Sequence, residues 1–412
     1  MKSALFMLLM GWLSCCGLLS FRWRRQLSLE WNDPVFRVPV LVFESDDWGP
    51  GPEQDAEALK GIGAVLSQFS DATGRHPVMT LGVILGIADG EWIAASGFKQ
   101  YRSIPLADPR YAAIVEEMRR GTSMGVFAPQ MHGGEHYWPP ALLARAREDS
   151  VVRSWVGQGQ WARTESLPSE LQTRWADCTV LPSVPVADSE IRPAVEAEVK
   201  AFSEVFGFAP RVVVPPTFVW TESVEKTWAS QQIAVLVTPG RMLTGRDLAG
   251  KLIQASQTWN GQRSASGMTY VVRDVYFEPG RGHRAEDLVR AMVAKTRCGR
   301  PTLVETHRDN FTASAELRTQ SVTEIARAIK YCKDKFPSVR FISTEELAEV
   351  LMAKSPQFIE HRLVARALVF LWRVRANPSL RKYSLVTGLA LLSWLGVRVL
   401  ARPGFRAEEA PH

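Results

Sequence analysis

The chain has 412 residues, of which 46% are hydrophobic, and a formal net charge of +6. This length suits one large catalytic domain with added segments or two ordinary domains, and the hydrophobic content excludes a mainly disordered protein. The positive charge lies at the two ends, because residues 26–360 hold 36 of the 49 basic side chains against 41 of the 43 acidic ones. Such a distribution argues against nucleic acid as the main partner and favours an anionic membrane surface.

Residues 1–25 are predicted to be a membrane anchor or a signal segment. Residues 3–21 carry no charge and are long enough to span a bilayer as one helix. A cleaved signal peptide is the alternative, since the small residues from Ser14 to Gly17 offer a weak cleavage site. The arginines at 22, 24 and 25 follow the apolar run and disfavour export. We therefore expect a retained anchor with the main domain on the cytoplasmic face, and export stays open as the alternative.

The five cysteines form no regular spacing that would indicate a disulfide framework or a zinc–thiolate site. Two of them lie in the apolar N-terminal segment, and the other three are far apart: Cys15, Cys16, Cys178, Cys298 and Cys332. This pattern is compatible with a reducing compartment.

Residues 30–355 are predicted to form one domain of the α/β class, since short apolar runs alternate with helical patterns. Strands are predicted over 38–43, 78–85, 125–130, 211–214, 234–237, 270–277, 302–305 and 340–342. Helices are predicted over 54–69, 110–120, 190–206, 223–231, 285–296 and 314–335. Seven or eight such units favour a distorted (β/α)7-8 barrel, with an open doubly wound sheet as the alternative. The residues from Ser150 to Asp188, with Trp155, Trp161 and Trp175, are predicted to form a loop-like insertion over the mouth.

Residues 356–412 are predicted to be a membrane-associated tail. Helical spacing from His361 to Ala376 places Arg362, Arg366 and Arg373 on one face, which predicts a basic amphipathic helix in the membrane interface. A helix packed on the main domain is the alternative. The uncharged run over 383–397 is short for a membrane span, and whether it spans or lies flat stays open.

Polar side chains follow three of the predicted strands. Asp46 and Asp47 follow the first strand, His132 and His136 the third, and His307 the penultimate one. The carboxyl ends of barrel strands meet at one mouth, where catalytic side chains lie. A helical turn would place both imidazoles of the His pair on one face, and two histidines with one carboxylate hold catalytic zinc. Alone, the Asp pair fits a turn and the His pair a surface helix, but together they favour a metal site.

The same residues carry a resemblance to a known family. The Asp-Asp pair, the His-x-x-x-His pair, the loop Pro215-Pro216-Thr217-Phe218 and His307 stand in the order seen in the polysaccharide deacetylase family, of the NodB-homology, carbohydrate esterase type. The resemblance covers most of residues 36–350. It implies a metal-dependent hydrolase that removes an N-acyl group, acetyl or formyl, from an amino sugar of a glycan or of a lipid-linked sugar.

The resemblance also implies roles for individual residues. Asp47, His132 and His136 would hold a divalent metal, expected to be Zn²⁺, while Asp46 would be the base and His307 the acid. A backbone N–H near Thr217 or Phe218 would help to stabilise the oxyanion.

The chain departs from the family pattern at three points. Trp48 is inserted before Gly49, the arginine two residues ahead of the proline loop is missing, and the later aspartate motif is not clear. Arg308 is the candidate for the missing arginine, and Asp274 is the candidate for the aspartate.

Aromatic side chains close to the motifs suit the faces of sugar rings, with ordinary packing as the alternative. The predicted substrate-binding residues are Trp48, Trp138, Pro216, Thr217, Phe218, Trp220 and Arg308.

Two other functions stay open. The segment His132-Gly133-Gly134-Glu135-His136 also fits an inverted zinc-protease pattern, although that pattern needs an unbroken helix, which the two glycines disfavour. The third hypothesis is a non-catalytic, membrane-associated glycan-binding protein.

Overall fold

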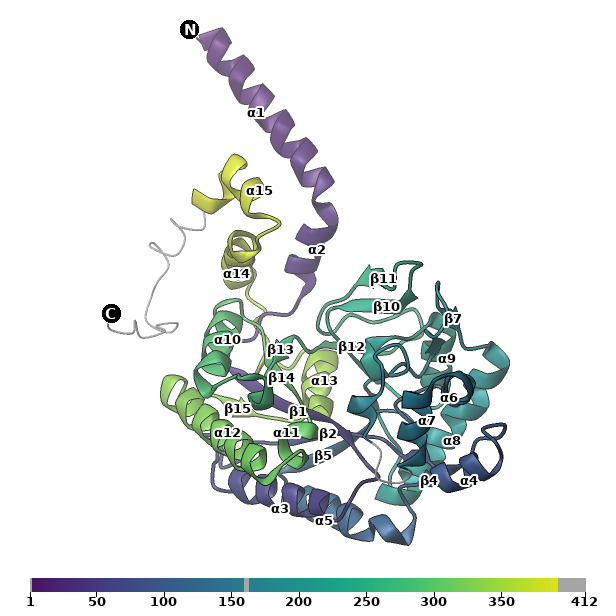
Figure 1. Cartoon of the computed structure of the whole chain (residues 1–412). Coiled ribbons are helices and arrows are strands. Elements are labelled where there is room, and N and C mark those ends of the chain that lie inside the picture. Colours follow the sequence, from purple (N-terminus) through teal and green to yellow (C-terminus); the bar gives the residue numbers. More distant parts are fainter. Residues whose placement is uncertain (1, 159–162, 392–412) are drawn as a thin grey trace.

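The computed structural model describes residues 2–158 and 163–391. At the centre of this part of the chain lies a nine-stranded parallel sheet with the order β12-β9-β8-β5-β2-β1-β14-β13, and β15 pairs with the start of β1 (Figure 1). The strands are β1 (Val40–Trp48), β2 (Met79–Val83), β5 (Phe127–Met131), β8 (Val212–Val213), β9 (Val235–Thr238), β12 (Thr269–Val272), β13 (Val275–Tyr276), β14 (Thr302–His307) and β15 (Arg340–Phe341).

The strand order confirms the predicted barrel. Read as a circle, it follows the order along the chain from β1 to β14, and β14 then pairs with β1. A doubly wound sheet would reverse its order at a switch point, so that alternative is wrong. Among the described residues the circle is open only between β12 and β13. The segment 270–277, which was predicted as a single strand, forms these two strands instead.

The two faces of the sheet carry different side chains. Val40 and Val42 of β1 belong to an inner apolar cluster that includes Leu347 and Leu351 of α13 (Thr344–Ala353). Leu41 and Phe43 belong to the outer cluster, which packs against the surrounding helices. Because side chains alternate along a strand, Glu44 and Asp46 continue the inner face toward the mouth. The surrounding helices are α3 (Gln54–Leu66), α5 (Ala112–Ser123), α8 (Asp188–Phe206), α9 (Glu222–Ser230), α10 (Ala285–Arg297) and α12 (Ala315–Lys335).

The segment from 150 to 188 is more regular than predicted. It contains α7 (Ser150–Gly157) and the antiparallel pair β6 (Ala176–Asp177) and β7 (Val184–Pro185). Trp155 and Trp175 are buried in the outer cluster, so their packing orders this segment. Trp161 lies outside the described residues. The other described elements are β3 (Gly86–Ala88), β4 (Ser103–Pro105), α4 (Gly90–Ala95), α6 (Pro139–Glu148), α11 (Asp309–Thr312), β10 (Arg241–Arg246) and β11 (Leu252–Gln257).

The N-terminal segment forms α1 (Lys2–Arg22), which projects from the domain, and α2 (Arg24–Asn32), which lies against it (Figure 1). Within α1, the stretch Leu5–Arg22 is long and apolar enough to cross a membrane, and none of it is buried. Signal sequences have the same length and apolar composition.

The C-terminal helix α14 (Leu363–Ala376) packs on the domain, as the alternative interpretation predicts. Phe370 contacts Trp31 of α2 edge to face, with the ring centroids 5.5 Å apart. Arg373 is buried and donates to the carbonyls of Glu30 (2.9 Å) and Asp33 (2.7 Å). The prediction that Arg373 belongs to a basic face of this helix in the membrane interface is therefore wrong. Helix α15 (Arg381–Val386) follows, and residues 392–397 of the predicted apolar run lie outside the described residues.

Candidate metal centre

The two aspartates lie within β1 rather than after it. The register between β1 and β2 shifts between Ser45 and Trp48, where β1 contains one residue more than β2. Asp47 occupies this bulge with a φ of +70°. A bulge changes the direction in which side chains leave a strand, whereas neighbours in a regular strand point to opposite faces. The inserted Trp48 is therefore part of a backbone irregularity at the carboxyl end of β1.

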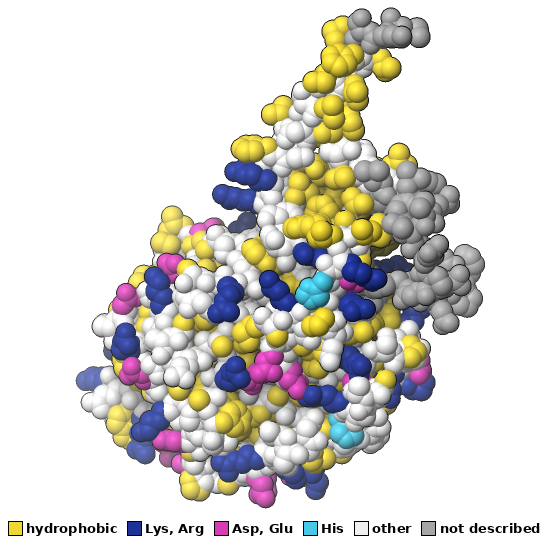
Figure 2. Space-filling view, turned by 180° about the vertical axis from the view of Figure 1, so that it is seen from behind, with side chains coloured by type: hydrophobic (Ala, Val, Ile, Leu, Met, Phe, Trp, Pro, Cys, Tyr) yellow, Lys and Arg dark blue, Asp and Glu magenta, His cyan; other side chains and the backbone are white. Residues whose placement is uncertain are grey.

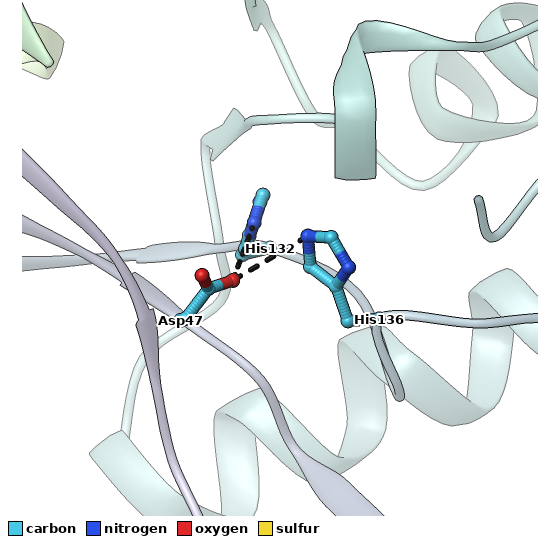
Figure 3. Close-up of side chains that lie close together, drawn as sticks. All are labelled: Asp47, His132 and His136. Carbon is cyan, nitrogen blue, oxygen red and sulfur yellow. Dashed lines mark ion pairs between the residues drawn. The ribbon is translucent and has the colours of Figure 1, made fainter. Parts of the chain in front are cut away.

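The three predicted metal ligands converge. The carboxylate oxygen Oδ1 of Asp47 lies 3.4 Å from Nε2 of His132 and 3.4 Å from Nε2 of His136 (Figure 3). All three side chains are buried, and their ligand atoms lie within 4.8 Å of one another. Asp47 and the two histidines, which lie 85 and 89 positions after it in the sequence, thus form one cluster of the kind that holds a divalent ion.

The surroundings of the three residues fit a cation. Nδ1 of His132 lies 2.8 Å from the carbonyl oxygen of Val214, which leaves Nε2 free to face Asp47. Oδ1 of Asp47 is buried and has no hydrogen-bond partner. Burial lowers the pKa of His136 to about 4, so this ring is neutral at pH 7 and can act as a ligand. Burial also opposes the charge of His132, yet Asp46 and Asp47 raise its pKa, so the pocket attracts positive charge.

The histidine pair is not on a helical turn, which corrects the prediction. His132 and His136 follow β5 in an irregular loop, where Gly133 has a φ of +109°. Glu135 is engaged elsewhere, since it pairs with Arg174 at 3.0 Å and accepts a hydrogen bond from Tyr101 at 3.1 Å. The zinc-protease pattern needs a helix, so the structure contradicts it.

Arg273, which the sequence interpretation missed, holds the predicted base. Its guanidinium group donates to Asp46 (2.5 Å) and Glu44 (2.6 Å), and its Nε lies 3.4 Å from Glu305. Burial raises the pKa of Asp46, but the positive charges of Arg273, His132 and His307 together lower it below its ordinary value, so the carboxylate is charged. Oδ1 of Asp46 is buried without a hydrogen-bond partner. Arg273 stands between β12 and β13, where the barrel is open.

Arg308 does not orient Asp46, which corrects that prediction. Its guanidinium group donates to the carbonyl of Pro50 (3.2 Å) and to Glu165 (3.5 Å), and it lies 3.8 Å from Asp55. Only its backbone N–H contacts Asp46, by donating to the Asp46 carbonyl (2.9 Å). The side chain is buried in this cluster, so a direct role in substrate binding is also not seen.

His307 has a buried carboxylate partner that the sequence interpretation also missed. Nδ1 of His307 lies 2.6 Å from Glu278, whose other oxygen accepts a hydrogen bond from Asn310. Burial lowers the pKa of His307, but the hydrogen bond to Glu278 and the charge of Asp47 raise it to about 10. Asp274, the candidate for the aspartate of the family pattern, pairs with Lys295 near the surface and does not contact this histidine.

The proline loop, Pro215 to Phe218, lies beside Arg273, and Val214 directly before it contacts His132. Thr217 and Phe218 have φ values of +52° and +56°, a left-handed conformation that is costly for residues other than glycine. The ring of Phe218 stacks on the guanidinium of Arg273, 5.0 Å from its carbon. The Phe218 N–H donates to the carbonyl of Pro215 (2.8 Å), so of the two predicted N–H groups, that of Thr217 is the one left for an oxyanion.

Two of the three predicted rim tryptophans are core residues. Trp48 and Trp220 are fully buried, and their indole N–H groups donate to Ser45 (2.9 Å) and Glu225 (3.1 Å). They cannot stack on a sugar ring in this structure, which corrects their assignment. Trp138 is partly exposed beneath the guanidinium of Arg174, and its substrate-binding role stays a prediction.

No family model matches the sequence. No curated protein matches it either. Solved structures do match. A Mycobacterium smegmatis protein described as a polysaccharide deacetylase is 12% identical, covering 81% of this chain and 96% of its own, with a TM-score of 0.39. A carbohydrate esterase family 4 pseudoenzyme from Bacillus anthracis is 10% identical, covering 76% and 66%, with a TM-score of 0.37. A family 4 acetyl xylan esterase from Clostridium thermocellum, in complex with a cobalt ion, is 11% identical, covering 77% and 94%, with a TM-score of 0.35.

The chain is similar to polysaccharide deacetylases of carbohydrate esterase family 4. This is the resemblance that the order of the motifs predicts. In this chain the candidate ligands and His307 stand in the order of that pattern, and Arg273 and Glu278 are the charged side chains that contact Asp46 and His307.

Proposed function

We propose that this chain is a metal-dependent hydrolase that removes an N-acyl group, acetyl or formyl, from an amino sugar. Asp47, His132 and His136 would hold the metal, for which Zn²⁺ is the proposed ion because two imidazoles and one carboxylate suit it. When bound, such an ion polarises a carbonyl group and lowers the pKa of water.

One observation carries this proposal. Asp46 on β1 and His307 on β14 are direct partners in the parallel register, so the proposed base and acid lie side by side on neighbouring strands, next to Asp47 of the ligand cluster. The base is charged and has a free oxygen, while the acid has a pKa of about 10 and carries its proton at neutral pH. The two groups therefore have opposite protonation states, as acid–base catalysis requires.

The proposed steps follow from these states. Asp46 accepts a proton from the attacking water, and the Thr217 N–H stabilises the charge that develops on the carbonyl oxygen. His307 then donates its proton to the nitrogen of the leaving amine. An amide needs this acid, since an amine anion is a poor leaving group. Glu278 stabilises the imidazolium until the proton is transferred.

The substrate we propose is an amino sugar of a glycan or of a lipid-linked sugar. The lipid-linked form is motivated by α1, whose apolar stretch is exposed along its length. We propose that the chain is retained at the membrane with the barrel on the cytoplasmic side, because Arg22, Arg24 and Arg25 follow the apolar stretch.

The test measures bound metal and amine release with the purified full-length protein. Short N-acetylated and N-formylated amino-sugar oligomers are offered as substrates, and free amine is quantified. We expect turnover with at least one of them, and its loss in Asp46→Asn with the metal still bound. A protein that binds these oligomers without releasing amine, in the presence of a full complement of zinc, would instead be the non-catalytic glycan-binding protein.

A further inference from the structure

The hairpin of β10 and β11 presents apolar side chains to solvent. Strand β11 is exposed along its whole length, including Leu252 and Ile253. Leu248, in the turn between the strands, is 78% exposed. Such a cluster is unusual on a domain surface that serves no contact.

A second short hairpin extends this apolar surface. Ser183, next to β7, donates its backbone N–H to the carbonyl of Arg246 (2.9 Å), and its hydroxyl accepts from the Arg246 N–H (2.8 Å). These bonds fix the β6–β7 turn against β10. The exposed apolar residues of both hairpins together form what we call the hairpin patch: Val180, Leu181, Val184, Leu248, Leu252 and Ile253.

The hairpin lies beside the helix that continues from α1. A cavity of about 270 Å³ separates them, lined by Gln26 and Glu30 of α2 and by Gly240 and Gln257 at the base of the hairpin. Figure 1 shows β10 and β11 next to α2, on the side of the domain from which α1 projects. A membrane crossed by α1 would therefore come close to this side of the domain.

The same side of the domain carries further apolar and basic side chains. Leu363 and Val364 at the start of α14 are exposed, as is Leu385 of α15. Figure 2 shows hydrophobic side chains gathered at the base of α1, with Lys and Arg side chains around them. The terminal helices and the hairpin thus both expose apolar side chains on this side of the domain, with Lys and Arg side chains nearby.

The charges on the hairpin fit an anionic surface. Arg241 and Lys251 are exposed at either end of the hairpin strands. The nearby acid, Asp247, accepts hydrogen bonds from the backbone N–H groups of Ala249 and Lys251, both at 2.9 Å, and so orders the turn. Apolar side chains flanked by Lys and Arg bind to the interface of membranes that contain anionic lipids.

We infer that the hairpin patch lies in the interface of an anionic phospholipid bilayer when α1 is inserted in it. The hairpin would be a second contact, far from α1 in the sequence, which limits how the barrel can tilt relative to the membrane. This inference concerns the surface and does not depend on the proposed hydrolase activity.

The test places an environment-sensitive fluorophore on the hairpin of the full-length protein. Leu248→Cys is labelled in a background in which the accessible thiols of Cys15, Cys16 and Cys298 are changed to Ser. Met124→Cys, at the exposed position directly after α5, is the control, since α5 lies on the opposite side of the domain from α1 in Figure 1. Both proteins are reconstituted in vesicles of phosphatidylcholine with phosphatidylglycerol.

We expect nitroxide-labelled lipid to quench the probe at 248 at least about threefold more than the probe at 124, as for an interfacial side chain. The added changes Leu252→Asp and Ile253→Asp, at exposed positions, should remove this difference. Equal quenching at the two positions would overturn the inference. It would also be overturned if the probe at 248 were already shielded from aqueous iodide without lipid, because a second copy of the chain would then cover the patch.

Discussion

The guanidinium group of Arg273 donates a hydrogen bond to the carboxylate of Asp46 from the segment between β12 and β13, where the described barrel is open. The arginine follows β12 and its guanidinium group donates to both Asp46 and Glu44, which lie two residues apart on the inner face of β1. All three side chains are fully buried. A buried carboxylate needs a partner with opposite charge, and the planar guanidinium can serve two carboxylates at once.

The change Arg273→Lys should therefore reduce turnover. One ammonium group cannot reproduce both hydrogen bonds, so Asp46 would lose its orientation and kcat should fall by about 10²-fold, within the range seen for misplaced acid–base groups. Metal content should stay unchanged. Arg308→Lys is the matched control, since Arg308 is buried nearby but its side chain does not contact the Asp46 carboxylate. A larger loss of kcat in the control than in Arg273→Lys would restore Arg308 as the orienting residue.

Zinc content should depend on the ligand cluster and not on Glu135. We expect His132→Ala and Asp47→Ala to lower bound zinc by at least about tenfold after dialysis, because each removes one of three protein ligands. Glu135→Gln should retain the metal, since Glu135 contacts Arg174 and Tyr101 instead. Elemental analysis by mass spectrometry measures this directly. Unchanged zinc in both ligand variants would contradict the assignment of the site.

The pH dependence of turnover should report on the pair of His307 and Glu278. His307 has a folded-state pKa of about 10 against an ordinary value of 6.5, so the stability it contributes is complete below pH 6.5 and is lost as the pH rises through 10. Turnover that needs the protonated ring should fall in the same alkaline range. In Glu278→Gln the pKa of His307 drops, and the alkaline limb of the pH–rate profile should move to lower pH.

The control for this shift is Asp274→Asn. Asp274 pairs with Lys295 near the surface and does not contact His307, so its profile should match that of the unchanged protein. If the alkaline limb moved in Asp274→Asn and stayed in place in Glu278→Gln, the partner of His307 would be wrongly assigned.

A glycine on β2 makes room for Asp46. A Cβ atom at Gly82 would lie 2.3 Å from Oδ1 of Asp46, closer than any such contact allows. We expect Gly82→Ala to displace this carboxylate and to lower kcat by at least about tenfold while the protein stays folded. In Gly63→Ala, within α3, the nearest atom would be 3.7 Å away, so this variant should keep full activity. Circular dichroism and amine release measure the two effects, and equal activity of both variants would count against the role of Asp46.

The barrel could be predicted from the sequence because apolar runs and helical patterns alternate along the chain. The helix predicted over 285–296 is α10 at Ala285–Arg297. The order of the strands in the sheet could not be predicted, because strands that pair are far apart in the sequence and their local residue patterns do not identify their partners. The segment 270–277 was predicted as one strand because its apolar pattern does not show the break after Val272.

The cluster of candidate metal ligands could be predicted because each of the three residues follows an apolar run. Arg273 was missed because it lies in the middle of the segment predicted as one strand. Glu278 was missed because it directly precedes Pro279 and Gly280, which are typical of a turn. The sequence position of Glu44, by contrast, could have indicated that its carboxylate lies beside that of Asp46. It lies two residues before Asp46 in an otherwise apolar strand, and the period of two places both carboxylates on the inner face.

The bulge at Asp47 makes the count of residues in β1 as important as their identity. Deleting Trp48 would return the strand to a regular pleat and send the neighbouring acids to opposite faces, one inward and one into the layer of helices. The chain would then keep every side chain of the site and still be unable to assemble it.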